Sequence, residues 1–205
     1  MVSRDTLPRL IGIAGPSCAG KSEVAQGVAA ALAAPIISLD SYYKDLARIA
    51  FEERKRANFD VPEALDKELL AGQIALLSQG AEIHVPVYDF ARHVRAAEIR
   101  CVRTTAHAVV EGLFALYWEN IRRFFHTKVF IQAEDAVCFE RRLERDVRER
   151  NRTPESVLEQ YQSTVRPMAE RYILPTRQFA DLVLCGTDPI EQSVEAVLAH
   201  VSADS

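Results

Sequence analysis

Residues 15–22 hold the chemistry that is easiest to recognise, because they fit the pattern GxxxxGK[ST] at every fixed position. Glycines let the backbone of such a loop wrap closely, so that several N–H groups point inward at phosphate oxygens. A helix that follows the loop adds its own N-terminal N–H groups and the positive end of its dipole. The alternative is an ordinary glycine-rich turn, but an apolar strand before the motif and a helix after it favour phosphate binding.

Two side chains of this phosphate loop (residues 15–22) have distinct roles in phosphoryl chemistry. Lys21 places a point charge on the β- and γ-phosphates, and Ser22 offers its hydroxyl to Mg²⁺. The predicted nucleotide contacts are Gly15, Ser17, Cys18, Ala19, Gly20, Lys21, Ser22 and Glu23.

Two acids follow short apolar runs, Asp40 after residues 36–39 and Glu111 after residues 109–110. Ligands of open α/β sheets bind at the carboxyl ends of the strands, where both acids would lie. Near a phosphate loop, such a carboxylate can hold the metal or accept a proton. Each acid alone is equally explained as a turn or cap residue. The phosphate loop in the same chain favours the functional interpretation for both.

Residues 141–152, the arginine segment, carry six arginines and no lysine. They are Arg141, Arg142, Arg145, Arg148, Arg150 and Arg152. One interpretation is a solvated helix in which acids and arginines pair at i, i+4 spacing. The other is a mobile lid that closes on a triphosphate, since the planar guanidinium matches phosphate oxygens. From the residues alone both interpretations stay open.

Short apolar runs that alternate with helical stretches predict the elements that must position these residues. We expect buried strands at residues 10–14, 35–39, 107–110, 128–131 and 181–184. We expect helices at residues 22–33, 62–79 and 135–150, and one that opens at residues 188–189. This alternation predicts a mainly parallel sheet with helices on both faces. Residues 82–86 and 99–102 form the exception, a small antiparallel ribbon flanking residues 86–97.

The composition is that of one ordinary α/β domain over residues 1–205, with 48% hydrophobic and 26% charged residues. It excludes a disordered or collagen-like chain, and the net charge of -4 gives no global basic field for nucleic acid. No apolar run approaches the ~18–20 residues of a membrane span, and residues 1–10 lack an apolar signal core. The four cysteines form no CxxC pair, so we expect reduced thiols in a cytoplasmic protein rather than disulfides or a zinc site.

Beyond the phosphate loop, further blocks follow one another in a characteristic order. They lie at residues 40–43 (DSYY), 58–60 (NFD), 86–90 (PVYDF), 111–112 (EG), 145–150 (RDVRER), 160–161 (QY), 165–168 (VRPM) and 179–181 (FAD). With these blocks the chain resembles uridine kinases (uridine–cytidine kinases), in the group that includes phosphoribulokinase and bacterial pantothenate kinase. The resemblance runs from the phosphate loop to about residue 181, and the YDF and RDxxER blocks are its most specific parts.

The resemblance implies a P-loop NTPase three-layer fold with a nucleoside-binding ribbon at about residues 82–103 and an arginine-rich helical lid at about 138–153. It implies transfer of the γ-phosphoryl group of ATP, with GTP as an alternative donor, to the 5′-hydroxyl of uridine or cytidine, with Mg²⁺. The expected partners are therefore a nucleoside and a nucleoside triphosphate, with no nucleic acid and no membrane. Relatives are often homotetramers, so the resemblance also implies a homo-oligomer.

The same resemblance assigns roles to individual residues. Asp40 matches the general base, and Ser22, Asp40 and Glu111 match the Mg²⁺ environment. Lys21, Arg145 and Arg150 match the cations that contact the phosphates during transfer. The nucleoside-contacting set comprises Asp60 on the ribose hydroxyls, Tyr88 and His93 on the pyrimidine edge, Phe59 and Phe90 as apolar walls, and Tyr43, Arg142, Arg152 and Gln160.

The chain departs from the family pattern at several positions. Leu39 replaces a common His or Gln, Val61 replaces a usual His, and Asn151 stands where Gly separates two lid arginines. Residues 185–189 (CGTDP) replace a basic, glycine-rich stretch near the adenine. Asn151 bears on the stiffness of the lid, and the replacement at residues 185–189 bears on the choice of phosphate donor and, less directly, of nucleoside.

Two alternative functions fit parts of the sequence. One is a kinase for another small alcohol, such as a pantothenate-like or phosphoribulose-like acceptor, which the set Tyr88, His93 and Gln160 disfavours. The other is a non-catalytic nucleotide switch, which would have no need of a base at Asp40.

Overall fold

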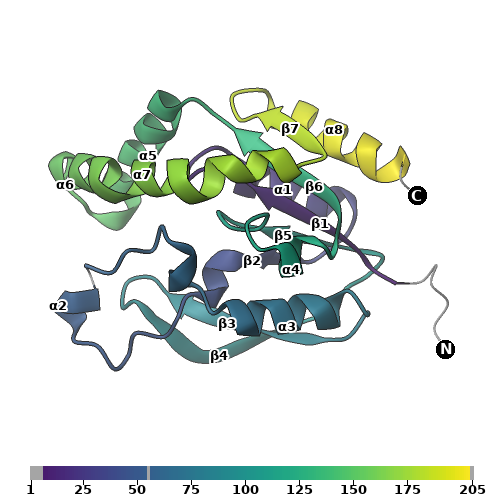
Figure 1. The fold of residues 1–205 in the computed structure, drawn as a ribbon, viewed down its shortest axis with the longest axis horizontal. Coiled ribbons are helices and arrows are strands. Elements are labelled where there is room, and N and C mark those ends of the chain that lie inside the picture. The colour runs from purple at the N-terminus through teal and green to yellow at the C-terminus, as the bar shows by residue number, and fades with distance from the viewer. Residues whose placement is uncertain (1–6, 55, 204–205) are drawn as a thin grey trace.

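A five-stranded parallel sheet lies at the centre of the computed structural model, which describes residues 7–54 and 56–203 (Figure 1). The strand order is β2-β5-β1-β6-β7. Its strands are β1 (Arg9–Ala14), β2 (Ile36–Ser38), β5 (His107–Glu111), β6 (Phe125–Gln132) and β7 (Leu182–Cys185). Residues 1–6 of the segment analysed for a signal peptide lie outside the described residues. The predicted parallel sheet is confirmed, and all five expected strands are present.

Helices cover both faces of this sheet. The helices of the described residues are α1 (Lys21–Ala31), α2 (Phe51–Arg54), α3 (Lys67–Leu77), α4 (Glu119–Arg122), α5 (Asp135–Arg150), α6 (Pro154–Gln160), α7 (Arg166–Met168) and α8 (Ile190–Ala203). The short helix α2 buries no residue and lies away from the sheet (Figure 1). Adjacent strand residues point to opposite faces, so Leu10 packs in the cluster that holds α3, and Ile11 packs in the cluster that holds α1 and α8. No helix within the described part of the chain is both long and apolar enough to span a membrane.

The predicted antiparallel ribbon is present as β3 (Ile83–Asp89) and β4 (Val94–Val102). Its strands extend further toward the turn than expected, because Pro86 lies within β3 rather than ending it. The register shifts between Pro86 and Tyr88, and a two-stranded ribbon tolerates a proline because each strand is an edge strand. The ribbon therefore carries Tyr88 and the segment around His93 to its tip.

The prediction of one helix over residues 62–79 was wrong for its first turns. Residues Pro62–Ala64 form a short 3₁₀ turn, and Leu65 is extended and pairs with Tyr43. The α-helix begins only at Lys67, because the Asp66 carboxylate accepts a hydrogen bond from the Leu69 N–H at 3.2 Å and caps it.

Sequence reasoning did not predict the irregular helical segment that follows α5. After α6 it continues as π turns at Tyr161–Val165 and Ala169–Ile173, on either side of α7, and ends as a 3₁₀ turn at Leu174–Phe179. Pro167 lacks a backbone N–H, and the Thr164 hydroxyl bonds back to the carbonyl of Gln160 at 2.8 Å. Both features disturb a regular α-helical ladder.

Candidate functional site

The carboxyl ends of β1, β2 and β5 meet at one edge of the sheet. Glu111, the last residue of β5, lies opposite Ile13 of β1 and Ser38 of β2. The phosphate loop leaves β1 directly after this point, and Asp40 follows β2 in a 3₁₀ turn at Leu39–Tyr42. Parallel pairing therefore brings together the loop and the two acids that the sequence singled out.

The backbone of the phosphate loop has the left-handed conformations that an inward-facing ring of N–H groups requires. Gly15 has φ 149°, and a Cβ there would lie 2.2 Å from the carbonyl oxygen of Ile131. Cys18 has φ 62°, and Gly20 has φ 99° where it precedes α1. The other predicted nucleotide contacts occupy the loop and the first turn of α1, where Ala19 is buried and Glu23 is exposed. This geometry is that of a phosphate-binding nest at a helix N-terminus.

Lys21 is only 8% exposed, and its Nζ donates a hydrogen bond to the carbonyl oxygen of Pro16 at 2.8 Å. The ammonium group is thereby held against the loop itself. A phosphate cradled by the loop N–H groups would meet this positive charge at short range.

The hydroxyl of Ser22 donates a hydrogen bond to Oε2 of the buried Glu111 at 3.3 Å. Asp40 lies near enough to Glu111 for the two carboxylates to repel each other. Two carboxylates and a hydroxyl are hard oxygen donors, and a divalent cation relieves their repulsion. The three residues predicted for Mg²⁺ therefore fit that ion by their chemistry.

Asp40 has the electrostatic properties of a usable base. Solvent reaches its side chain even though protein atoms surround it on most sides. Desolvation, followed by repulsion from Glu111, raises the pKa of Asp40 to about 6, and Lys21 partly opposes the increase. At neutral pH the carboxylate is ionised, and it is more basic than an exposed aspartate.

An aromatic cluster of five residues forms beside Asp40. Its members are Tyr43, Phe59, Tyr88, Phe90 and His93. Tyr43 packs edge-on against Phe59 with ring centroids 5.2 Å apart, and it lies 5.4 Å from Tyr88. His93, with φ 55° in the ribbon turn, stacks on Phe59 at 5.0 Å. The structure thus assembles the predicted base-binding side chains from three separate segments.

Polar groups accompany this aromatic cluster. The Tyr88 hydroxyl is buried and has no hydrogen-bond partner among the described residues, so it is available to a ligand. Asp60 is 8% exposed, and desolvation raises its pKa, which Arg142 opposes. Desolvation raises the pKa of the Tyr43 phenol well above its usual value, and the nearby carboxylates of Asp40 and Asp60 raise it further. Tyr43 therefore lies near both carboxylates. The cluster therefore lies between Asp40, the predicted base, and Asp60, the carboxylate predicted for the ribose.

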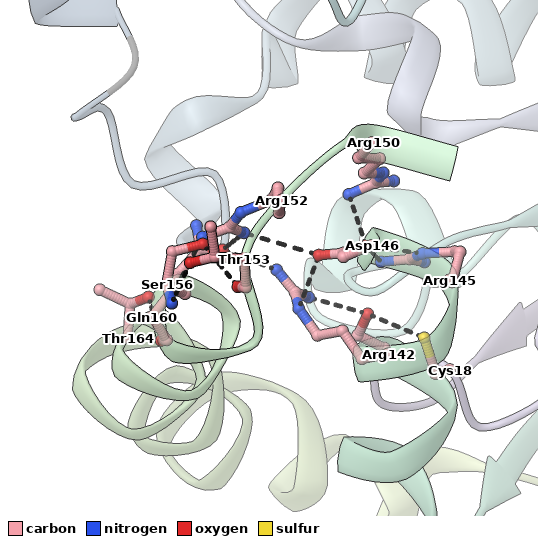
Figure 2. A network of polar contacts seen from close by, with 11 residues as sticks. Cys18, Arg142, Arg145, Asp146, Arg150, Arg152, Thr153, Ser156, Gln160 and Thr164 are labelled. Atoms are coloured by element: carbon pink, nitrogen blue, oxygen red, sulfur yellow. Dashed lines mark hydrogen bonds and ion pairs between the residues drawn. The ribbon is translucent and has the colours of Figure 1, made fainter. Parts of the chain in front are cut away.

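Within the arginine segment, Arg148 fits the solvated helix, whereas Arg142 contacts the phosphate loop. Arg148 pairs with Glu144 and Glu149 at the exposed surface, at 3.4 and 2.6 Å, as a solvated helix would. Arg142 is 6% exposed and donates to Ser17 Oγ of the phosphate loop at 3.1 Å. It also donates to Gln160 Oε1 at 3.2 Å (Figure 2). One face of α5 is thus turned toward the phosphate loop.

The remaining predicted contacts of this segment gather around Asp146. Arg152 also donates to Gln160 Oε1, and Arg145 and Arg150 form ion pairs with Asp146 (Figure 2). Asn151 adopts φ 51° and ψ 39° at the end of α5, the left-handed conformation that Gly would adopt more readily.

Sequence reasoning missed three residues of this region. Asp146 is fully buried among the arginines. Arg141 donates to the carbonyl oxygen of Gly186 at 2.9 Å and to that of Cys18 at 3.4 Å. Gly186 lies against the loop, since a Cβ there would be 1.9 Å from the Ala19 carbonyl oxygen. The RDxxER block could have indicated a role for Asp146, and the glycine that follows the last strand could have indicated a close backbone contact at Gly186.

We expect Gly186→Ala to displace the phosphate loop, because a Cβ cannot lie 1.9 Å from a backbone oxygen. The free energy of unfolding should fall by about 1–3 kcal/mol, and the affinity for a nucleoside triphosphate should fall with it. Thermal denaturation and titration calorimetry measure the two effects. Gly72→Ala on α3 is the control, because nothing lies within 4 Å of its added Cβ. Unchanged triphosphate affinity in Gly186→Ala would contradict the prediction.

Comparison with known proteins gives a consistent result. The Phosphoribulokinase / Uridine kinase family matches residues 10–188. A "Uridine kinase" of Deinococcus deserti is 42% identical over 197 residues, covering 95% of each chain. A "Uridine kinase" of Chloroflexus aggregans is 39% identical over 199 residues, covering 96% of this chain and 95% of the relative.

Among solved structures, phosphoribulokinase from Rhodobacter spheroides superposes with a TM-score of 0.67 at 14% identity, covering 89% of this chain and 74% of that one. This likeness supports the fold, while the identity to the curated relatives extends over nearly the full chain. The resemblance inferred from the motifs is confirmed, and the chain belongs to the phosphoribulokinase/uridine kinase family.

Proposed function

We propose that the chain is a cytoplasmic nucleoside kinase that transfers the γ-phosphoryl group of ATP to the 5′-hydroxyl of uridine or cytidine, giving UMP or CMP. The observation that carries the proposal is the placement of Tyr43. Its ring packs in the aromatic cluster, and its phenol lies near both Asp40 and Asp60. The aromatic cluster, the carboxylate proposed for the ribose and the proposed proton acceptor are therefore neighbours beside the phosphate loop. The relatives named uridine kinase support the same function.

In this proposal Asp40 accepts the proton of the attacking hydroxyl, as its raised pKa permits. Phosphoryl transfer passes through a loose transition state, so most of the catalysis comes from positioning and from stabilising charge. Lys21 and the guanidinium groups of Arg145 and Arg150 supply positive charge for the phosphate oxygens. Mg²⁺ held by Ser22, Asp40 and Glu111 would add charge neutralisation at the phosphates.

Nucleoside recognition in this proposal uses both parts of the aromatic cluster. The rings of Phe59 and Phe90 offer apolar walls to a flat base. The unpartnered hydroxyl of Tyr88 and the imidazole of His93 supply polar contacts at the base edge. Asp60 accepts hydrogen bonds from the ribose diol, and burial makes an unmatched carboxylate there costly. Arg142, Arg152 and Gln160 complete the polar side.

The experiment that tests this function measures ADP release with ATP and Mg²⁺ across a panel of acceptors. The panel contains uridine, cytidine, purine nucleosides, pantothenate and ribulose 5-phosphate, and Asp40→Asn serves as the inactive control. Release that depends on uridine or cytidine and disappears in the control supports the proposal. Release with another acceptor alone, or binding of ATP without acceptor-dependent release, rejects it.

We expect His93→Ala to impair nucleoside use rather than ATP binding, because His93 stacks on Phe59 in the aromatic cluster. Loss of a stacking and hydrogen-bonding partner should raise the KM for uridine by about 10–100-fold. The KM for ATP should stay within about 2-fold of its original value. Steady-state kinetics with each substrate varied in turn measure the difference.

The matched control is His84→Ala on the same ribbon, whose exposed side chain lies outside the aromatic cluster. It should leave both KM values unchanged. An equal loss for both substrates in His93→Ala would mean that the residue only maintains the ribbon turn.

A further inference from the structure

Asp146 of α5 is fully buried, and four arginines converge on its carboxylate (Figure 2). They are Arg142, Arg145, Arg150 and Arg152. One negative charge thus faces four positive charges in a region without solvent around the carboxylate. The group is held strongly, and the arginine cluster keeps an excess of positive charge for anionic ligands.

The two oxygens of Asp146 sort these arginines into two pairs. Oδ1 lies 2.8 Å from Arg145 Nη2 and 3.4 Å from Arg150 Nη1. Oδ2 lies 3.5 Å from Arg142 Nε and 3.5 Å from Arg152 Nη1. The first pair are the proposed phosphate contacts, and the second pair are the proposed nucleoside contacts.

The pair on Oδ2 is also tied to other parts of the protein. Arg142 reaches Ser17 of the phosphate loop, and both Arg142 and Arg152 donate to Gln160. The pair on Oδ1 has Asp146 as its only ion-pair partner within residues 7–54 and 56–203. The guanidinium groups of Arg145 and Arg150 therefore keep N–H donors for phosphate oxygens.

The contacts on Oδ2 are loose compared with those on Oδ1. Neither Asp146 Oδ2 nor Arg142 Nε has a hydrogen-bond partner among the described residues, although the two atoms are 3.5 Å apart. Buried polar atoms are normally satisfied, so this half of the network gains by moving closer. A small rotation of the carboxylate would tighten one side and change the other, because its two oxygens are rigidly joined.

We propose that Asp146 is a positioning residue that couples the two substrate subsites of this kinase. A triphosphate that accepts hydrogen bonds from Arg145 and Arg150 shifts their guanidinium groups, and the Asp146 carboxylate reorients because these groups pair with its Oδ1. Oδ2 then holds Arg142 and Arg152 in the orientation that nucleoside binding requires. The inference rests on the proposed function. It states that one buried side chain couples binding of the triphosphate to binding of the nucleoside.

The test measures the Kd of uridine by calorimetry, with and without a saturating ATP analogue whose β–γ bridge is a methylene group, in the presence of Mg²⁺. In the unmodified protein the analogue should tighten uridine binding by about 5–150-fold, the usual range for coupled sites. In Asp146→Asn the tightening should fall below about 2-fold. The control is Glu144→Gln, an exposed carboxylate on the same helix that pairs with Arg148, and it should retain the full coupling.

Removing a buried charge can destabilise the chain, so Asp146→Glu provides a second variant that keeps the charge and moves it by one methylene group. It should melt within a few degrees of the unmodified protein and lose most of the coupling. Retained coupling in a folded Asp146→Asn or Asp146→Glu variant, or no coupling in the unmodified protein, overturns the inference. Failure of the proposed function is distinguishable, because the unmodified protein would then not phosphorylate uridine at all.

Discussion

Replacing Asp40 with Asn is expected to lower kcat by about 10²–10⁴-fold, the range for loss of a positioned general base. The amide keeps the size of the side chain but cannot accept the proton of the acceptor hydroxyl. ATP affinity should change little, because we expect the phosphate loop and Lys21 to bind the triphosphate, and an amide oxygen at residue 40 can still serve as a ligand for Mg²⁺. Steady-state kinetics give kcat, and calorimetry with ATP and Mg²⁺ gives the affinity.

The matched control for this variant is Asp181→Asn. Asp181 directly precedes β7, outside the phosphate loop and the aromatic cluster, and it accepts a hydrogen bond from the Lys128 N–H at 2.7 Å and pairs with the Lys128 ammonium group at 2.9 Å. An asparagine can still accept that bond, so turnover should stay normal. Near-normal turnover in Asp40→Asn would remove Asp40 from the role of base.

Replacing Lys21 with Met is expected to lower kcat by about 10²–10³-fold, comparable to the removal of one preorganised charge donor in other enzymes. The ammonium group is almost fully buried and held at the Pro16 carbonyl, so it is already oriented before a phosphate arrives. The KM for ATP should rise as well, because the charge acts on the bound triphosphate and on the transition state. Initial rates over a matrix of ATP and uridine concentrations separate the two effects.

Lys67→Met provides the comparison for Lys21→Met. Lys67 is a half-buried lysine at the start of α3, outside the phosphate loop. Its substitution should leave kcat and both KM values unchanged. If Lys21→Met kept kcat/KM for ATP within about 3-fold of the original value, the phosphate loop would have to act through its backbone alone.

Some of the fold could be predicted from the sequence with accurate bounds, and some could not. Helix α5 begins and ends at the predicted residues, because its strong charge pattern and the flanking Asn151 define it locally. The helix expected at residues 62–79 failed in its first turns, where Leu65 pairs with Tyr43. That pairing joins residues far apart in the sequence, so no local periodicity could indicate it.

The candidate site shows the same division. The sequence motifs named the residues of the aromatic cluster, and the structure brings Tyr43, Phe59 and Tyr88 into contact from separate segments. Asp146 was not predicted, because an acid between arginines on a helix is most simply a solvated ion pair. Its burial depends on how α5 packs, which its own sequence does not specify.

The sequence by itself determined the phosphate loop, the alternation of strands and helices, and the family. These features depend on residues close together in the chain, where glycine freedom, apolar spacing and motif order act directly. Only the tertiary structure decided which partners each charged group meets. It placed Gly186 against Ala19, divided four arginines between the two oxygens of Asp146, and set Asp40 beside Glu111. The physical reason is that long-range pairing and desolvation depend on the packing of distant elements, and this packing fixes both the distances between charges and their exposure to water.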